Sequence, residues 1–365
     1  MPLNPPAPEI TIVVPVYNER ANVEPLVQRL AAALSGTAFE IVFVDDASPD
    51  GTGDAVRAVA RTDPRCRLIS RMGRRGLSGA ALEGMLSALA PVVAVIDADL
   101  QHDEALLPRM KEALDAGQAD LAVATRYAAG GSGDALPGSR RALSSLGVRL
   151  ARRLFGVRLS DPLSGYFMVR RSLVEQVAPR ISPDGFKILF DLVTSAPAQT
   201  RIVELPYRFR PRERGESKLD PKVALEFAAL LVSKLSGGLL PLRFVLFCFV
   251  GALGIVVHLA VAWGALQLGR QFALAQLLAT VAAMTSNFFL NNAITHRDRR
   301  LRGAALLRGL AYFYLVCGLG VFANVGLASL LFLQQPTWWV AALAGALVGT
   351  VWNYAISASL VWRAR

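Results

Sequence analysis

Four long apolar runs occupy the last third of this 365-residue chain and limit what it can fold into. They cover about 242–268, 272–294, 304–333 and 338–362, and they contain no acidic residue. Each run exceeds the roughly 20 residues that a helix needs to cross a bilayer. A soluble four-helix core would need polar faces at helical spacing, and none is visible. The sequence therefore predicts an all-α transmembrane bundle of four helices at 241–365.

Positive charge is divided unevenly along the chain. Residues 241–365 contain nine arginines, no lysine and one aspartate, which places +8 of the total formal charge of +11 in this part. Five of the arginines, from Arg297 to Arg308, follow the second apolar run, whereas the other two connections hold one arginine and none. Arginine-rich loops stay on the cytosolic side. We therefore expect an integral protein of the cell inner or plasma membrane with both termini cytosolic, and Trp362 in an interfacial belt.

In the first 206 residues, apolar segments alternate with amphipathic ones. Strands that alternate with helices form βαβ units and a mostly parallel sheet. Ligands of such sheets bind beyond the carboxyl ends of the strands, where the strand order reverses. The absence of G-x-G-x-x-G after the first strand, and of a P-loop, disfavours a dinucleotide fold and a P-loop enzyme. The expected strands are ITIVVPV, FEIVFVD, CRLIS, VVAVID and DLAVAT.

The stretch VIDADLQHDE, residues 95–104, begins as a buried strand and then presents side-chain oxygens at Asp97, Asp99 and Gln101. Closely spaced carboxylates repel each other unless a cation holds them. Oxygen ligands suit Mg²⁺ or Mn²⁺, which take their remaining ligands from water and phosphate. The stretch predicts a divalent metal at Asp97, Asp99 and Gln101 that binds together with a diphosphate. A solvated loop without a metal is the alternative.

Eight motifs follow one another between Ile10 and Leu219: TIVVPVYNER, IVFVDDASPDGT, GLSGA, VIDADLQH, ATRY, DPLSGYF, GFKIL and RPRERGESKL. In this order they resemble the inverting family-two glycosyltransferases of GT-A fold, especially the dolichol- and polyprenol-phosphate mannose synthases. The apolar runs resemble GtrA-like membrane domains. The resemblance implies a cytosolic, Rossmann-like α/β GT-A domain at 1–220, an interfacial helix or linker at 221–240 and the transmembrane domain at 241–365. That family usually has proline after LQH, where this chain has Asp103, so we expect an added charge near the metal.

The resemblance implies a role for each matching polar residue. Asp46 would contact the nucleotide, whereas Asp45 is expected to be structural. Arginine forks match phosphate oxygens in two-point contacts. The implied nucleotide-sugar site is Pro15, Tyr17, Glu19, Val44, Asp46, Asp97, Ala98, Arg212 and Lys218; the lipid-phosphate site is Arg126, Arg140 and Ser144; the catalytic residues are Asp99, Arg126, Arg212 and Lys218.

The implied activity is transfer of a hexose, mannose from GDP-mannose in the first place, to dolichyl or undecaprenyl phosphate at the cytosolic membrane face. Because a lipid phosphate is already an anion, the reaction needs alignment and charge stabilisation and no general base. The basic stretch 139–159 and the stretch 221–240 are expected to lie on the bilayer surface. Glucosyl transfer from UDP-glucose and translocation of a lipid-linked sugar remain alternatives. A processive polysaccharide synthase is disfavoured because a Q-x-x-R-W motif is absent, and no nucleic-acid partner is expected.

Overall fold

In the computed structural model the chain divides into two units, Met1–Leu239 and Leu240–Arg365. The structure describes residues 7–127, 159–182, 187–210, 221–237, 239–334 and 350–362, together with 149, 153, 155–157, 185 and 348. Four residues predicted to bind substrates, Arg140, Ser144, Arg212 and Lys218, lie outside the described residues, as does most of the stretch 139–159.

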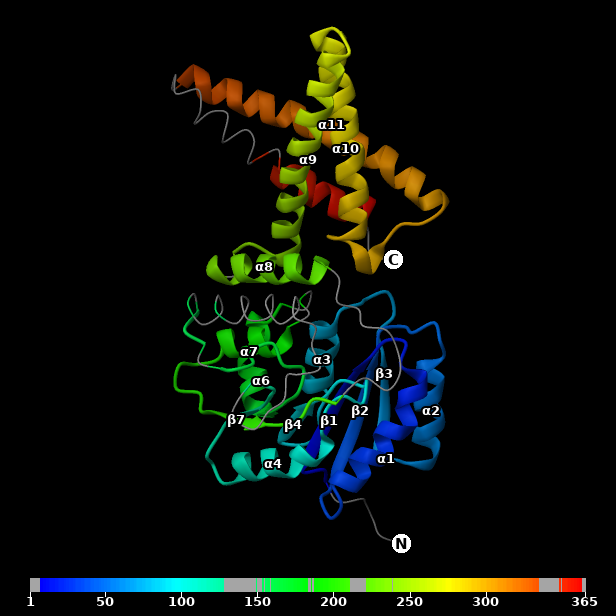
Figure 1. The fold of residues 1–365 in the computed structure, drawn as a ribbon, viewed down its shortest axis with the longest axis vertical. Coiled ribbons are helices and arrows are strands. Elements are labelled where there is room, and N and C mark those ends of the chain that lie inside the picture. The colour runs from blue at the N-terminus through cyan, green and yellow to red at the C-terminus, as the bar shows by residue number, and fades with distance from the viewer. Residues whose placement is uncertain are drawn as a thin grey trace. The chain divides into compact units, whose positions relative to one another are not determined.

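The first unit is built on a seven-stranded sheet with the order β3-β2-β1-β4-β6-β5-β7 (Figure 1). Strand β6 runs antiparallel to both of its neighbours, and all other pairs are parallel. The predicted mostly parallel α/β fold is therefore confirmed, and β6 and β7 are elements that the sequence pattern did not reveal. The strands are β1 (Ile10–Val16), β2 (Phe39–Asp45), β3 (Cys66–Ser70), β4 (Val92–Val95), β5 (Leu121–Thr125), β6 (Phe167–Arg170) and β7 (Ile202–Pro206).

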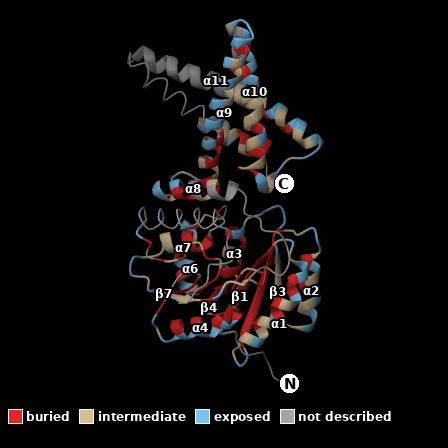
Figure 2. Cartoon of the chain, in the orientation of Figure 1, coloured by how far each residue is buried: buried red, intermediate tan, exposed pale blue. Residues whose placement is uncertain are grey.

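The core of this unit lies in the sheet, where every residue of β1, β2, β4 and β5 is buried (Figure 2). Such strands need apolar side chains on both faces, which explains their continuous apolar runs. Helix α1 buries Val23, Leu26, Val27 and Leu30, the spacing of one helical face. The other helices are α2 (Thr52–Thr62), α3 (Leu77–Leu86), α4 (Leu107–Asp115), α6 (Arg171–Val177), α7 (Ile188–Ser195) and α8 (Pro221–Leu235), and α1 spans Val23–Ala33.

Helix α8 belongs to the first unit and packs on α7. Lys234 donates to Ser195 Oγ at 2.9 Å and pairs with the buried carboxylate of Asp191. The rings of Phe190 and Phe227 meet edge to face with centroids 5.5 Å apart. These contacts anchor one side of the helix; that its other side lies on a bilayer stays a prediction.

The described part of the second unit is helical. It contains α9 (Leu242–Gln267), α10 (Phe272–Ala293), α11 (Ala304–Gln334) and a π-helical turn at Ser357–Val361. Among the described residues, α9 is the one helix long and apolar enough to cross a membrane, with a shorter apolar segment at Ala304–Leu319. Part of the fourth predicted span, residues 338–347 and 349, lies outside the described residues.

Polar side chains at the end of α10 form hydrogen bonds to other segments of the second unit. Asn292 Oδ1 accepts from the Leu301 N–H at 2.8 Å and from the indole N–H of Trp362 at 3.1 Å. The Trp362 ring stacks on His296 with centroids 4.3 Å apart and is fully buried. The expectation that Trp362 lies in an interfacial belt is therefore wrong, because its ring and its N–H both have partners inside the unit. For Asn292, hydrogen bonding within the bundle accounts for the polar residue.

Candidate active site at the carboxyl edge of the sheet

The strand order reverses between β1 and β4. Strand β1 pairs with β2 on one side and with β4 on the other, and all three run in the same direction. The chain thus leaves β1 toward one edge of the sheet and later returns to its other side. Ligands of open α/β sheets bind outside the strand ends at such a reversal.

Backbone strain is concentrated at this edge. Within the described part of the chain, the non-glycine residues with positive φ are Asn18, Ala47 and Leu100, at 58°, 55° and 61°. They follow the ends of β1, β2 and β4. This conformation costs non-glycine residues energy and persists where the surroundings enforce it, often at binding sites.

The loop after β1 brings several predicted nucleotide residues to the edge. Pro15 of β1 pairs in register with Val44 of β2, and both residues are buried. The Arg75 guanidinium lies over the Tyr17 ring, 4.7 Å from the ring centroid. Glu19 Oε2 accepts from Asn22 Nδ2 at 2.7 Å. A hollow of about 640 Å³ beside them is lined by Asn18, Glu19, Arg20, Ala21, Asn22, Glu24, Pro25 and Asp50.

The two aspartates at the end of β2 have separate roles. Asp45 Oδ1 accepts from the Ser48 N–H at 3.1 Å and so shapes the turn, as expected of a structural residue. Asp46 is buried, and its two oxygens accept from Arg71 Nη1 at 2.6 Å and from the Gly76 N–H at 2.7 Å. Burial raises the pKa of Asp46 despite the neighbouring Arg71. Asp46 therefore holds the loop that precedes α3, and its contact with a nucleotide stays a prediction.

The residues after β4 form a turn instead of continuing the strand. Strand β4 ends at Val95, and Leu100 turns the backbone with its positive φ. Asp99 Oδ1 accepts from the Gln101 backbone N–H at 3.2 Å, so the Asp99 carboxylate is held within this turn, and the two residues belong to a turn and not to an extended strand. Gln101 Nε2 donates to the Arg210 carbonyl oxygen at 3.0 Å, which leaves the amide oxygen as the atom suited to ligate a cation.

Asp97 is held in place from two sides. His102 Nε2 lies 3.3 Å from Asp97 Oδ2, and His102 Nδ1 lies 2.9 Å from the Tyr207 hydroxyl. Both contacts are satisfied when Nε2 carries the proton and the Tyr207 O–H donates to Nδ1. A Cβ on Gly165 would stand 2.6 Å from Asp97 Oδ2, which explains the glycine in DPLSGYF. Burial would raise the pKa of Asp97, but the hydrogen bond from His102 and the charges of Lys187 and Arg126 lower it.

The donor set of the turn at 97–101 fits a hard divalent cation. Asp99 and Gln101 offer a carboxylate and an amide oxygen within one turn, and Asp97 adds a carboxylate whose side chain is 37% exposed. No cluster of three His, Cys, Asp or Glu side chains suited to a metal occurs among the residues described. A cation at this turn would therefore take further ligands from a diphosphate and water, as Mg²⁺ does.

Arg126 follows β5 and grips a buried carboxylate. Its Nε and Nη2 donate to Asp161 at 2.8 and 3.2 Å, and Asp161 has no exposed surface. The guanidinium also lies 5.3 Å from the ring centroid of Phe209. Burial, with the nearby charge of Arg126, lowers the pKa of Lys187. This arrangement fixes Arg126 at the edge of the sheet; its contact with a lipid phosphate stays a prediction.

Several residues of this edge were missed by reasoning from the sequence. Asp161 and Lys187 stand in the motifs DPLSGYF and GFKIL, which signalled the family but indicated no contacts. His102 stands in VIDADLQH and was given no role. Tyr207 and Arg210 follow β7, more than 100 positions from the residues they touch, and no local pattern relates them.

Comparison with known proteins gives matches to both units. The family model described as glycosyl transferase family 2 matches residues 11–178, and that of the GtrA/DPMS transmembrane domain matches residues 246–362. The dolichol-phosphate mannosyltransferase of Pyrococcus furiosus is 33% identical over 97% of this chain and 99% of its own. The dolichol-phosphate mannosyltransferase of Saccharomyces cerevisiae is 37% identical over 60% and 84%. The polyprenol monophosphomannose synthase of Mycolicibacterium smegmatis is 35% identical over 59% and 82%.

The match that extends over both units carries the assignment. The chain belongs to the family 2 glycosyltransferases, in the group of the dolichol-phosphate mannosyltransferases, with a GtrA/DPMS transmembrane domain. The predicted resemblance, the enzyme class and the membrane character of the chain are thereby confirmed.

Proposed function

We propose that this enzyme transfers mannose from GDP-mannose to a polyprenyl phosphate such as dolichyl or undecaprenyl phosphate, at the cytosolic face of the membrane. One observation carries the proposal: the turn at Asp97–Gln101 and the Arg126–Asp161 pair stand at the same sheet edge, in a chain that also has a transmembrane domain. The turn suits a donor diphosphate, and Arg126 suits an anionic acceptor. The membrane domain would keep the enzyme where a lipid acceptor is found.

The chain's own residues would bind and align the two substrates. The nucleotide would lie at the carboxyl ends of β1 and β4, against Tyr17 and Glu19. A divalent cation at Asp99 and Gln101 would supply charge neutralisation for the departing diphosphate. The acceptor phosphate oxygen, already anionic, would attack the anomeric carbon from the side of Arg126, with inversion. Rate enhancement then depends on orientation and on fixed charges, and no side chain has to remove a proton.

A donor comparison tests this function. Purified full-length chain in detergent, with Mg²⁺ or Mn²⁺ and undecaprenyl phosphate, would be given radiolabelled GDP-mannose or UDP-glucose, and labelled lipid would be measured. We expect mannolipid from GDP-mannose at least about tenfold faster than glucolipid from UDP-glucose, a difference of about 1.4 kcal/mol in transition-state binding. Faster labelling from UDP-glucose would identify UDP-glucose as the donor instead of GDP-mannose. Absence of lipid product with either donor would reject the proposed transfer to a polyprenyl phosphate.

The proposed cytosolic face implies a topology. With both termini and the arginine-rich loop cytosolic, a cysteine in place of Gln334 should react with an impermeant thiol reagent added outside intact cells. A cysteine in place of Arg300 should react only after lysis. Both variants would be made after Cys66, Cys248 and Cys317 are replaced by serine. The reverse labelling pattern would reject the cytosolic active site.

A further inference from the structure

The segment after β7 lies along the residues that follow the turn at 97–101. The Arg210 N–H donates to the Gln101 carbonyl oxygen at 2.9 Å, and Gln101 Nε2 donates to the Arg210 carbonyl oxygen at 3.0 Å. The Tyr207 hydroxyl meets His102 Nδ1 at 2.9 Å. Two segments separated by 109 positions are thus joined where the candidate metal ligands stand.

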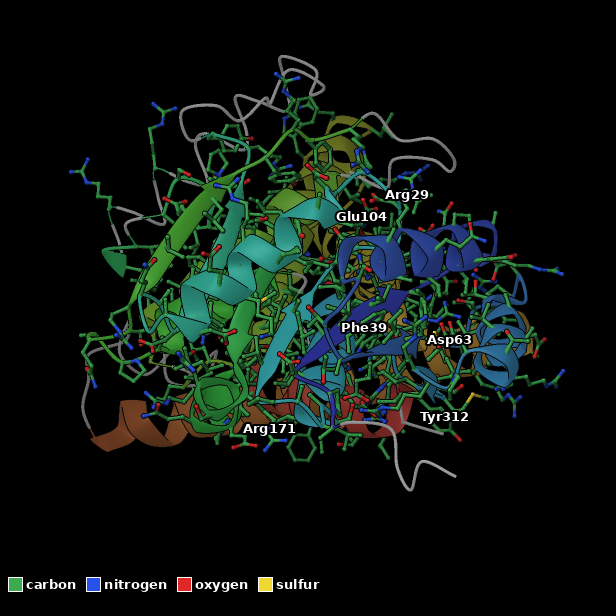
Figure 3. All side chains as sticks on the ribbon, turned by 90° about the horizontal axis from the view of Figure 1, so that it is seen from below. Arg29, Phe39, Asp63, Glu104, Arg171 and Tyr312 are labelled. Atoms are coloured by element: carbon green, nitrogen blue, oxygen red, sulfur yellow. The ribbon has the colours of Figure 1, made fainter. Side chains whose placement is uncertain are left out.

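The side chain of Arg210 adds a second set of contacts to three consecutive residues. Nη1 donates to the His102 carbonyl oxygen at 3.3 Å and to Glu104 Oε2 at 2.8 Å, and Nη2 donates to Asp103 Oδ1 at 2.9 Å. Glu104 is 4% exposed, and its other oxygen lies 3.9 Å from Arg29 Nη1; these two side chains are labelled in Figure 3. One guanidinium therefore fastens the whole stretch that follows Gln101.

Asp103, which the sequence suggested as an added charge near the metal, has a different position in this network. Its Oδ1 accepts from Arg210 Nη2 and, at 3.3 Å, from the Ala105 N–H. Its charge is therefore paired with Arg210 and caps the short helix that begins at Glu104.

We propose that Arg210 is a positioning residue for the metal site: gripped by Asp103 and Glu104, it fixes the turn that presents Asp99 and Gln101 to a divalent cation. The inference rests on the proposed function, since the cation is expected to bind with a nucleoside diphosphate. Residues that orient metal ligands matter because a misplaced ligand must be reorganised when the cation binds. Their loss commonly lowers metal affinity 10–100-fold.

A purely electrostatic role for Arg210 predicts the opposite change in cation affinity when Arg210 is removed. The direction of the measured change therefore tests the proposal. If Arg210 acted only as a nearby positive charge, its removal would strengthen cation binding, and removal of the Asp103 charge would weaken it. If the two residues act together by holding the turn, each substitution weakens binding. The double substitution then costs little more than either alone, because both remove the same contact.

The experiment measures Mn²⁺ binding to the purified full-length chain, by the electron paramagnetic resonance signal of free Mn²⁺, with GDP present and with UDP in parallel. The variants are Arg210→Gln, Asp103→Ala, which removes the oxygen that accepts from Arg210, and the pair combined. The matched control is Arg201→Gln, which removes a fork to Asp120 next to the other end of the same strand, β7. We expect the dissociation constant to rise about tenfold for each single variant, to rise no more than about twofold further for the pair, and to stay unchanged for the control.

Unchanged or tighter Mn²⁺ binding by Arg210→Gln would overturn the proposal while leaving the proposed function in place. Absence of Mn²⁺ binding by the wild-type chain with either nucleotide would overturn the metal site itself. Arg210→Gln removes the charged partner of the buried Glu104 and could unfold for that reason alone. Asp103→Ala keeps that partner and removes a side chain that is 35% exposed, so wild-type Mn²⁺ affinity in Asp103→Ala would by itself reject the proposal.

Discussion

The two edges of the sheet use the same kinds of ion pair in different surroundings. At the amino edge, Arg201 forks onto Asp120 with its side chain 56% exposed, and Arg65 forks onto Asp63 while covering the ring of Phe39 at 4.6 Å. Figure 3 labels Phe39 and Asp63 near this edge. At the carboxyl edge, Arg126 grips a carboxylate with no exposed surface.

The comparison shows which edge of the sheet carries interactions that are costly in folding free energy. Exposed pairs contribute little because water and salt screen them. Buried pairs must compensate the desolvation of both charges, and breaking one leaves an isolated buried charge. The described non-glycine residues with positive φ also lie at the carboxyl edge. Desolvated charge and backbone strain coincide there, as expected for a site organised before its substrates arrive.

The largest effect should come from removing the cation of the buried pair. Arg126→Gln leaves Asp161 without its charged partner, a loss of about 3–5 kcal/mol. The thermal midpoint of the full-length chain in detergent should fall by roughly 6–20 °C. Arg126→Gln/Asp161→Asn should regain most of this stability but not lipid-sugar synthesis, since the acceptor contact stays missing. If Arg126→Gln is as stable as Arg201→Gln, the two edges do not differ as described.

Removing the charge of a proposed metal ligand should mainly slow the reaction. Asp99→Asn keeps the shape of the side chain, so the fold should persist while kcat falls by on the order of 10²–10³, about 3–4 kcal/mol. Chelation of the metal by EDTA should abolish labelled-lipid formation by the wild type. Asp120→Asn at the amino edge is the control and should keep wild-type activity. Full activity in EDTA would show that the reaction does not depend on a metal at this site.

A methyl group added at one glycine should separate catalysis from stability. Gly165→Ala places a Cβ against Asp97 Oδ2 and should lower the rate by roughly 10², because a small displacement at a reacting centre has that effect. Gly84→Ala places a Cβ against Val13 in the core and should lower the thermal midpoint instead. Rates per folded molecule and midpoints of both variants distinguish the two outcomes. Equal behaviour of the two variants would mean that Gly165 serves packing alone.

The smallest effect is expected at the exposed pair. The Arg201 hydrogen bond lowers the pKa of Asp120. Such a carboxylate stabilises the fold above the ordinary aspartate pKa of about 3.9, and this stability is lost as the pH falls through the lowered value. Asp120→Asn should cost less than about 1 kcal/mol at pH 7, and its thermal midpoint should approach that of wild type as the pH falls toward about 2. If the difference in thermal midpoint between Asp120→Asn and wild type grows as the pH falls, the pKa of Asp120 is not lowered in the folded state.

Local patterns in the sequence were sufficient for much of the fold. Strands β1, β2, β4 and β5 could be predicted because a fully buried strand of a parallel sheet is a continuous apolar run. The turn at Asp97–Gln101 stood out because carboxylates follow such a run directly. Strand β7 escaped notice because it is half-buried, so its residues carry no continuous apolar signal. Trp362 was placed wrongly because a tryptophan at the end of an apolar run has the same local pattern whether it faces lipid or packs on His296.

The sequence by itself determined the division into a charged α/β part and an apolar helical part, the chemistry of the residues at the strand ends and the family of the enzyme. Only the tertiary structure decided which charges meet: Asp46 with Arg71, Arg126 with Asp161, and Asp103 with Arg210. The physical reason is range. Periodicity and charge are properties of a few adjacent residues, whereas an ion-pair partner is selected when packing brings distant segments together.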